Sequence, residues 1–272
     1  MNSSAVHGNV FDEVPDLYDE VRPGYPEQVF EDIISLSGIP SGKRILEIGC
    51  GTGQATVPFA QRGYQMLCLE LGKDLAARAR ENLRDYPNVE IRRTSFEDWE
   101  PEVESFDLVI SATAFHWIPP EMGCAKAARV LKKSGFIALF WNYHPRPYTG
   151  FFRAVQSAYQ RALPDWQDPD KGPSDEDKIR ARKEQIDATG LFGPVTVRQY
   201  RWSKCYSSDQ YLKLLETYSD YRSLPDDRKR VLYDGVREVM NQFGGTVTRP
   251  YLTVLFHAPR ADIAQGEHTC DE

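Results

Sequence analysis

The sequence predicts a doubly wound α/β fold with a mostly parallel, seven-stranded sheet and a helical cap. Short apolar runs alternate with amphipathic segments along the first third of the chain, which is the pattern of parallel βαβ units. The first of these runs ends in a glycine-rich turn, as the first strand of a Rossmann-like sheet does. The length of 272 residues allows a core domain with an added cap.

Seven runs rich in apolar and β-branched residues are expected to form the strands. They span residues 44–48, 65–70, 89–93, 106–111, 136–141, 195–202 and 251–256. Helical periodicity marks residues 54–62, 74–84, 122–131 and 179–189. Crossovers between the parallel strands should be right-handed.

The chain is expected to have two parts. Residues 1–142 should form the ligand-binding core, and residues 143–272 should complete the sheet and add two insertions. The first insertion, near 143–178, carries five prolines, and the second, near 208–243, has a helical pattern. Both should cap the crevice at the carboxyl ends of the strands. The polar residues after Ala261 are expected to be frayed.

Composition restricts the class of protein. Hydrophobic residues make up 41% and charged residues 27% of the chain, as in a globular protein. The formal net charge of −7 argues against a nucleic-acid partner, which would favour a basic face. The five cysteines never form a CxxC spacing, and no clustered His, Asp or Glu spacing suggests a metal site.

The sequence also bears on where the protein works. The N-terminus lacks a basic segment followed by an apolar run, and no stretch approaches the ~20 apolar residues that cross a bilayer. We therefore expect a cytoplasmic protein with no membrane partner. The oligomeric state is left open.

The most informative segment is EIGCGTG at residues 47–53. Its three glycines remove side chains so that backbone can approach a ligand, and the helix that follows offers free N–H groups. Glu70 ends the next strand, 17 residues after Gly53. An acid at about this spacing hydrogen-bonds the ribose of an adenine nucleoside. The alternative is that Glu70 is only a solvated carboxylate at the end of a strand. In either case, we expect substitution of Glu70 by alanine to have little effect on folding.

Glu47 lies inside an otherwise apolar strand, directly before the turn. A carboxylate there offers little to a phosphate, because both groups are negative. It would stabilise a ligand that carries an ammonium and a sulfonium group, because opposite charges attract. The turn therefore favours a cationic nucleoside ligand.

The segment EIGCGTG resembles the first motif of the class I S-adenosylmethionine-dependent methyltransferases, and the resemblance continues in register over residues 16–142. YDEVRPGYP at 18–26 is similar to the Y-x-x-x-R-P-x-Y-P signature of the type 11, trans-aconitate methyltransferase-like subgroup. SFEDW at 95–99 resembles its adenine-side loop, and SATAFHW at 111–117 resembles its segment after the fourth strand. LKKSGF at 131–136 matches its L-K-P-G-G turn, with departures at the third and fourth positions.

This resemblance implies a methyltransferase that uses S-adenosylmethionine and acts on a small-molecule acceptor, with a carboxylate or a hydroxyl as the candidate acceptor group. The cofactor-binding residues that it implies are Tyr18, Arg22, Glu47, Gly49, Cys50, Gly51, Gly53, Glu70, Leu71, Ser95, Phe96, Glu97, Ser111 and Ala114. Many members of the class place an aspartate directly after the third strand to bind the adenine amino group. This chain has Thr94 and Ser95 there, so the adenine contact is left open.

His116 is the candidate catalytic residue, because it follows the fourth strand at the mouth of the expected site. It could act as a general base on a hydroxyl or amine, or it could only shape the pocket. A carboxylate acceptor is already ionised and needs no base. Arg22 could bind a carboxylate of the donor or acceptor or lie on the surface, and Tyr18 could cover the donor or only pack. The candidate substrate-binding residues are Trp117, Tyr143, Arg146 and Arg222.

Two other classes share parts of this pattern. An NAD-dependent oxidoreductase would share the glycine turn and the ribose acid, but Glu47 and the segment AFHW at 114–117 argue against it. A module that binds S-adenosylmethionine without catalysis would share the whole site. A comparison of S-adenosylmethionine and NAD binding tests the first alternative, and methyl turnover tests the second.

Overall fold

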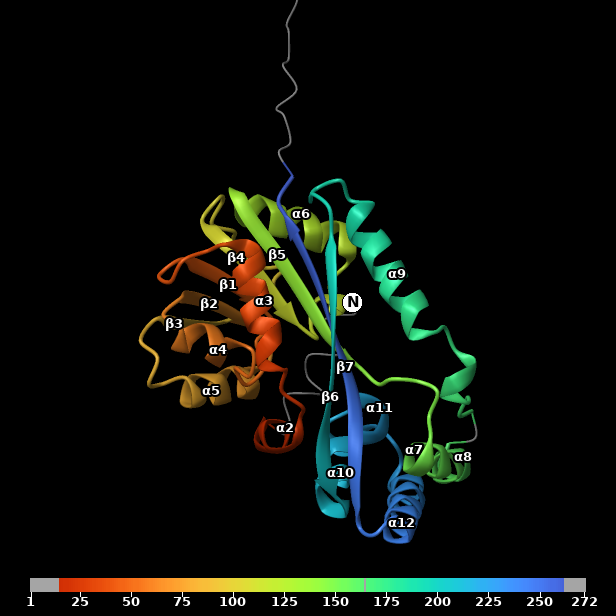
Figure 1. Ribbon diagram of the computed structural model, residues 1–272. Helices are drawn as coiled ribbons and strands as arrows, with labels where there is room; N and C mark the ends of the chain where they lie inside the picture. The colour runs from red at the N-terminus through yellow and green to blue at the C-terminus, as the bar shows by residue number, and fades with distance from the viewer. Residues whose placement is uncertain (1–14, 164, 262–272) are drawn as a thin grey trace, which may run out of the picture.

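The computed structural model describes residues 15–163 and 165–261. Its centre is one seven-stranded sheet in the order β3-β2-β1-β4-β5-β7-β6 (Figure 1). The first five strands are parallel, and β7 runs antiparallel to both of its neighbours. The predicted doubly wound, mostly parallel α/β fold is confirmed. The tail after Ala261, which was expected to be frayed, lies outside the described residues.

The elements follow one another along the chain with strands and helices alternating in the first half. The strands are β1 (Arg44–Ile48), β2 (Gln65–Glu70), β3 (Val89–Arg93), β4 (Phe106–Ala112), β5 (Leu131–Tyr143), β6 (Thr196–Ser207) and β7 (Thr246–Pro259). The helices up to β5 are α2 (Pro15–Val21), α3 (Glu27–Ser37), α4 (Thr56–Gln61), α5 (Lys73–Asn82), the 3₁₀ turn η1 (Phe115–Trp117) and α6 (Pro120–Val130). Those after β5 are α7 (Gly150–Ala154), α8 (Gln156–Ala162), η2 (Pro169–Lys171), α9 (Asp175–Asp187), α10 (Ser208–Glu216), α11 (Ser219–Arg222) and α12 (Asp226–Gln242).

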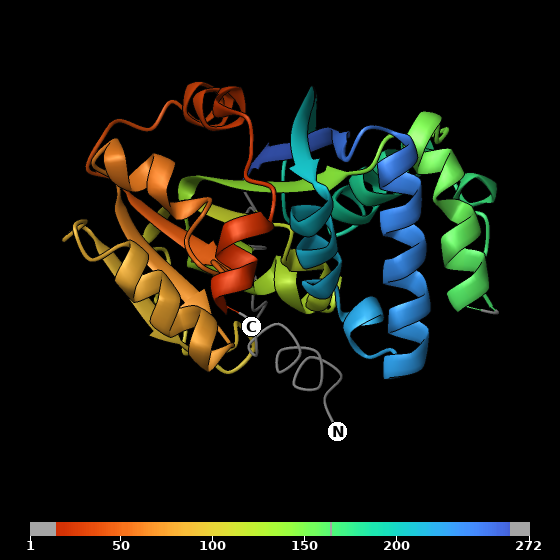
Figure 2. The ribbon, with the colours of Figure 1, turned by 90° about the horizontal axis from the view of Figure 1, so that it is seen from below.

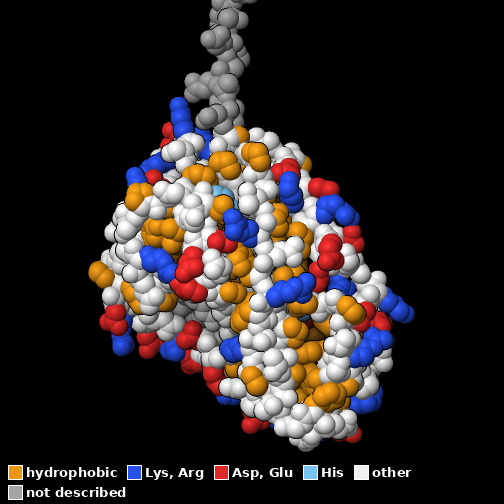
Figure 3. Space-filling view, viewed as in Figure 1, with side chains coloured by type: hydrophobic (Ala, Val, Ile, Leu, Met, Phe, Trp, Pro, Cys, Tyr) orange, Lys and Arg blue, Asp and Glu red, His pale blue; other side chains and the backbone are white. Residues whose placement is uncertain are grey.

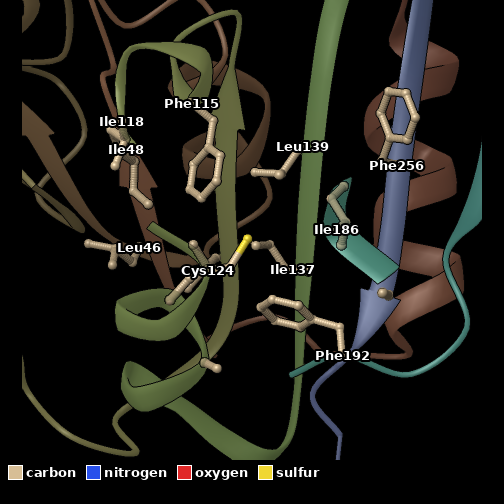
Figure 4. Packing of buried hydrophobic residues seen from close by; sticks show 14 of the residues in the cluster. Leu46, Ile48, Phe115, Ile118, Cys124, Ile137, Leu139, Ile186, Phe192 and Phe256 are labelled. Atoms are coloured by element: carbon tan, nitrogen blue, oxygen red, sulfur yellow. The ribbon is translucent and has the colours of Figure 1, made fainter. Parts of the chain in front are cut away.

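Both faces of the sheet are covered, which explains why its central strands are apolar on both sides. Successive side chains of a strand point to opposite faces, so Ile45 packs in one cluster and Leu46 in the other. Helices α3, α4 and α5 cover the face of Ile45. Helices α6 and α9 cover the other face, where Cys124 and Ile186 meet Ile137 of β5 (Figure 4).

At one end, the sheet extends into a third cluster of buried hydrophobic residues, separate from the two on its faces. The pairing of β5 with β7 stops at Tyr143 and Leu252, but β6 and β7 continue to pair as far as Ser207 and Thr246. The extra residues, 202–207 and 246–251, form a two-stranded projection that we call the β6–β7 arm. Helices α7, α8, α10 and α12 pack around this arm (Figures 1 and 2).

The structure changes several predicted boundaries. β6 and β7 are longer than the predicted strands at 195–202 and 251–256. The residues added to β6, SKCYS at 203–207, are mostly polar and carry no apolar run, so only pairing with β7 reveals them as strand. The predicted helix at 54–62 begins at Thr56, because the glycine turn continues to residue 55.

Candidate active site

A cavity of about 420 Å³ opens at the carboxyl ends of β1, β2 and β4. Ligands of open α/β sheets bind at this edge. The residues expected from the sequence that line it are Tyr18, Arg22, Gly49, Gly51, Glu70, Leu71, Ser95, Phe96, Glu97, Ala114, His116 and Trp117. The fold therefore brings five separate segments, from the N-terminal signature to the segment after β4, to one site.

The glycine turn after β1 is shaped for close approach. Gly49 has φ +71°, and a Cβ atom there would lie 2.5 Å from the Cβ of Ala114. Three amides of the turn are already used within the protein: Gly49 and Cys50 donate to the carbonyl of Leu69 on β2, and Gly53 donates to the carbonyl of Cys50. The turn thus offers a ligand a smooth backbone surface rather than a ring of free N–H groups.

Glu70 joins the glycine turn to the end of β2. One carboxylate oxygen accepts from the amide of Gly51 and the other from the amide of Gly72, each at 2.8 Å. Only 8% of the residue is exposed, and it lines the cavity. Because the carboxylate satisfies two backbone donors of neighbouring loops, we now expect its removal to destabilise the fold.

Helix α2 covers one side of the cavity. The guanidinium of Arg22 stacks on the rings of Tyr18 and Tyr218 at 4.8 and 4.3 Å, and donates to the carbonyl of Thr217 at 2.6 Å. The ring of Tyr18 lies against Gly51. These contacts tie the N-terminal signature to the turn between α10 and α11 and close the cavity from above the glycine turn.

The loop after β3 forms another side of the cavity. Thr94, Ser95, Phe96 and Glu97 all line it. The Ser95 hydroxyl donates to Asp98 at 2.7 Å, which holds the loop closed. Glu97 is therefore the carboxylate of this loop that reaches the cavity, whereas Asp98 serves the loop itself.

His116 and Trp141 form a hydrogen-bonded pair behind the mouth of the cavity. The indole Nε1–H of Trp141 donates to Nδ1 of His116 at 3.1 Å. An indole nitrogen can only donate, so Nδ1 carries no proton and the ring proton sits on Nε2. Burial, followed by the nearby charge of Arg182, lowers the pKa of His116 to about 4. The imidazole is therefore neutral at physiological pH.

Glu47 does not line the cavity. It shares the face of Ile45, where its carboxylate is fully buried and accepts from the Thr56 hydroxyl at 2.6 Å. Burial raises the pKa of Glu47 to about 7, against the effect of the hydrogen bonds from Thr56 and Cys68. The expected direct contact between Glu47 and a cationic ligand is therefore not supported by its position. Glu47 instead binds Thr56 at the start of α4, behind the glycine turn.

Six further expected residues lie outside the lining of the cavity. Those from the cofactor set are Cys50, Gly53 and Ser111, and those from the substrate set are Tyr143, Arg146 and Arg222. Ser111 donates to the carbonyl of Ile48 at 2.8 Å and thereby joins β4 to β1. Arg146 bonds the carbonyls of Pro169 and Pro173 and pairs with Asp175, so it fixes the loop before α9.

Sequence reasoning missed part of the lining. The residues concerned are Ile48, Leu69, Leu75, Ala112, Thr113, Ile118 and Asp220, and Tyr218 of the second insertion also lines the cavity. Thr113 has φ +56° and its hydroxyl is hydrogen-bonded to Tyr25 at 2.9 Å. A non-glycine residue in this conformation is strained and is often found at functional sites. No sequence pattern marks Thr113, and its hydrogen-bond partner Tyr25 lies 88 residues away in the chain.

Charges on the surface are mixed. On the face seen in Figure 3, Lys and Arg are interspersed with Asp and Glu. The charged residues that line the cavity are mostly negative. They are Glu70, Glu97 and Asp220, which carry negative charge, and Arg22, which carries positive charge. The described residues contain no helix that is both long and apolar enough to span a membrane.

The strand order, the glycine turn and the acid at the end of β2 together define an α/β protein with a nucleoside site. Residues 45–135 match the family model described as a methyltransferase domain. An uncharacterized methyltransferase of Geobacillus sp. (strain WCH70) is 30% identical, with 57% of this chain and 75% of that protein covered. An uncharacterized methyltransferase-like protein of Schizosaccharomyces pombe is 25% identical over 82% of each. The chain belongs to the class I methyltransferase family.

The fold has solved counterparts. Phosphoethanolamine N-methyltransferase 2 of Haemonchus contortus, determined in complex with S-adenosyl-L-methionine, superposes with a TM-score of 0.55 at 17% identity. The match covers 92% of this chain and 57% of that one. At this identity the likeness concerns the fold of the chain.

Proposed function

We propose that this chain transfers the methyl group of S-adenosylmethionine to a small-molecule acceptor held at the mouth of the 420 Å³ cavity. The observation that carries the proposal is the lining of that cavity: a glycine turn with its amides already used, a strand-end acid and an excess of carboxylates. S-adenosylmethionine is the cofactor of this family of methyltransferases. When bound, it supplies a methyl group activated by a positively charged sulfur.

The residues of the cavity fit such a cofactor better than a dinucleotide. A pyrophosphate needs free N–H donors, and those of Gly49, Cys50, Gly51 and Gly53 are committed. Three carboxylates against one guanidinium favour a cation. Glu70 is the residue to bind ribose, and the loop at 94–97 is the one to meet the base.

The acceptor side is formed by different residues. Trp117 is 39% exposed at the cavity and can exclude water from the reacting groups. Of the two insertions that we assign as a cap, the one at 208–243 contributes Tyr218 and Asp220 to the lining, and Tyr18 and Arg22 of the N-terminal signature face them. The position of that signature supports membership of the type 11, trans-aconitate methyltransferase-like subgroup.

Binding and turnover test the function. We expect S-adenosylmethionine and its demethylated product to bind with micromolar dissociation constants, of order −8 kcal/mol, by calorimetry. NAD should give no saturable heat. Radiolabelled donor with a metabolite mixture should then yield a labelled acceptor. Absence of donor saturation at millimolar concentration would overturn the proposal, and donor binding without any methylated product would favour a non-catalytic binding module.

The Trp141 hydrogen bond defines the role that we propose for His116. A general base would need a ring nitrogen without a proton facing the acceptor, but the nitrogen without a proton is the one that Trp141 occupies. The remaining Nε2–H is a donor. We propose that His116 holds an acceptor oxygen in line with the methyl group, as a carboxylate or other oxygen acceptor would require.

His116→Ala should therefore lower the turnover rate about tenfold, the loss expected from positioning alone rather than from a base, which contributes roughly 10²–10⁴. Donor affinity should be unchanged. Because the pKa of His116 is about 4, the wild-type rate between pH 5.5 and 9 should show no inflection from this group. Single-turnover methyl transfer across that range is the measurement.

His116→Gln is the matched control, because glutamine keeps a neutral N–H donor but cannot act as a base. It should recover most of the rate that His116→Ala loses. If the wild-type rate does show an inflection, and both variants abolish it and lose more than 100-fold in rate, His116 is a base and the proposed role is wrong.

A further inference from the structure

Arg249 is a buried cation away from the cavity described above. It lies on the β6–β7 arm, opposite Lys204. Only 9% of Arg249 is exposed. A guanidinium keeps its positive charge at every physiological pH, so this charge is buried.

The immediate partners of Arg249 are neutral. Nε donates to Nδ1 of His144 at 3.3 Å, and Nη1 donates to the Tyr211 hydroxyl at 3.4 Å. The rings of Tyr251 and Phe152 lie 5.7 and 5.9 Å from Cζ. Burial, followed by the charges of Arg249 and Arg22, lowers the pKa of His144 well below its usual range, so this imidazole is uncharged.

Among the residues that the structure describes, no carboxylate forms an ion pair at 4.0 Å or less with the charge of Arg249. A buried charge without a counter-ion destabilises a fold, because desolvation is not offset by attraction. An arginine in this situation is suited to an anion that arrives from outside the chain.

Space for a small anion adjoins the guanidinium. Arg249, His144, Tyr148 and Phe152 line a second cavity of about 40 Å³. This volume holds roughly three water molecules. It therefore suits the three heavy atoms of a carboxylate group.

The second cavity lies near the first. Tyr218 lines the large cavity, where its ring stacks on Arg22 at 4.3 Å, and it also interacts electrostatically with Arg249. His144 lies within electrostatic reach of both arginines. Tyr218, a residue of the large cavity, is therefore close enough to the buried guanidinium to interact with its charge.

We propose that Arg249 binds a carboxylate group of the acceptor, with Tyr211 and His144 holding the guanidinium in position. The bidentate fork of arginine matches the two oxygens of a carboxylate. The assignment of this carboxylate to the acceptor rests on the proposed methyl transfer. The binding of a carboxylate at Arg249 is independent of that proposed function.

Thermal unfolding with added succinate or acetate, at ionic strength fixed with sodium chloride, tests the subsite. Wild type should be stabilised by the carboxylates beyond the chloride control. Arg249→Met keeps the length of the side chain and removes the charge, so it should lower the affinity for succinate roughly 10- to 100-fold. Its melting temperature without ligand should equal or exceed that of wild type, because an uncompensated charge is lost.

Two further variants separate charge from position. Arg201→Met makes the same change in net charge at an exposed site of β6 and should leave the response to succinate intact. Arg249→Lys should keep part of the response and serves if the methionine variant fails to fold. No stabilisation of wild type by either carboxylate, or an undiminished response in Arg249→Met, would overturn the subsite.

Methyl transfer to a panel of carboxylic acids identifies the source of the carboxylate. For an acid that is methylated, Arg249→Met should raise KM at least tenfold and leave donor affinity unchanged. Methylation of such acids with unchanged KM in the variant would overturn the assignment to the acceptor. Carboxylate binding that depends on Arg249, in a protein that methylates nothing, would support the subsite while the proposed function fails.

Discussion

Gly49→Ala should lower the affinity for S-adenosylmethionine at least 100-fold and destabilise the fold by about 2–5 kcal/mol. Two effects add. The new Cβ would lie 2.5 Å from the Cβ of Ala114, and alanine resists the φ of +71° that Gly49 adopts. The turn or the segment after β4 must move, and both line the cavity. Calorimetric titration and chemical denaturation measure the two losses.

Gly190→Ala is the matched control for backbone strain. Gly190 has φ +64°, but nothing lies within 4 Å of a Cβ at that position. This variant should lose only about 1 kcal/mol of stability and keep full donor affinity. Adding Ala114→Gly to Gly49→Ala removes the overlap and should recover part of both losses. Equal destabilisation in Gly49→Ala and Gly190→Ala, without recovery in the double variant, would contradict the close approach.

The parts of the site that could be predicted are those whose residues are adjacent in sequence. The glycine turn, the end of β2 and the loop after β3 each lie at the end of a strand that a short apolar run reveals. Parallel strands bring their carboxyl ends to one edge, so the residues there meet. Residues 49, 51, 70, 95–97 and 114 line the cavity for this reason.

Glu47 shows a signal that was present but not used. Side chains of a strand alternate between faces, so Glu47 must share the face of Ile45 rather than that of Ile48. Ile48 lines the cavity and Glu47 does not. The period of the strand thus places the acid behind the turn, whereas its charge alone suggested a ligand contact.

Arg146 and Arg249 show what the sequence could not decide. Both lie next to a proline in a segment without strong periodicity. Arg146 is held by Asp175 and by the carbonyls of Pro169 and Pro173, which depend on how the insertion folds back. The burial of Arg249 depends on helices that pack around the arm from far along the chain. A cation at the active site and one that fixes a loop look alike until such contacts are known.

Glu70→Gln should weaken S-adenosylmethionine binding by about 1.5–3 kcal/mol, or roughly 10- to 150-fold. Each oxygen of Glu70 accepts one backbone N–H, and a carboxylate oxygen can accept more than one hydrogen bond, so a hydroxyl of the ribose can bind there as well. Glutamine removes the charge and turns one acceptor into a donor, which opposes the amide of Gly51 or Gly72. Glu70→Ala should show a similar loss of affinity and a larger loss of stability, because both amides are then left without their partner.

A thermodynamic cycle that combines the Glu70 variant with a modified ligand shows whether Glu70 contacts the ribose directly or acts only by holding the glycine turn. The probes are S-adenosylhomocysteine and its 2′-deoxy analogue, titrated into wild type and Glu70→Gln. In wild type, loss of the 2′-hydroxyl should cost about 1–2 kcal/mol, whereas in the variant it should cost little, because the partner of that hydroxyl is already altered. Equal costs in both proteins would show that Glu70 acts on the glycine turn and does not touch the ribose.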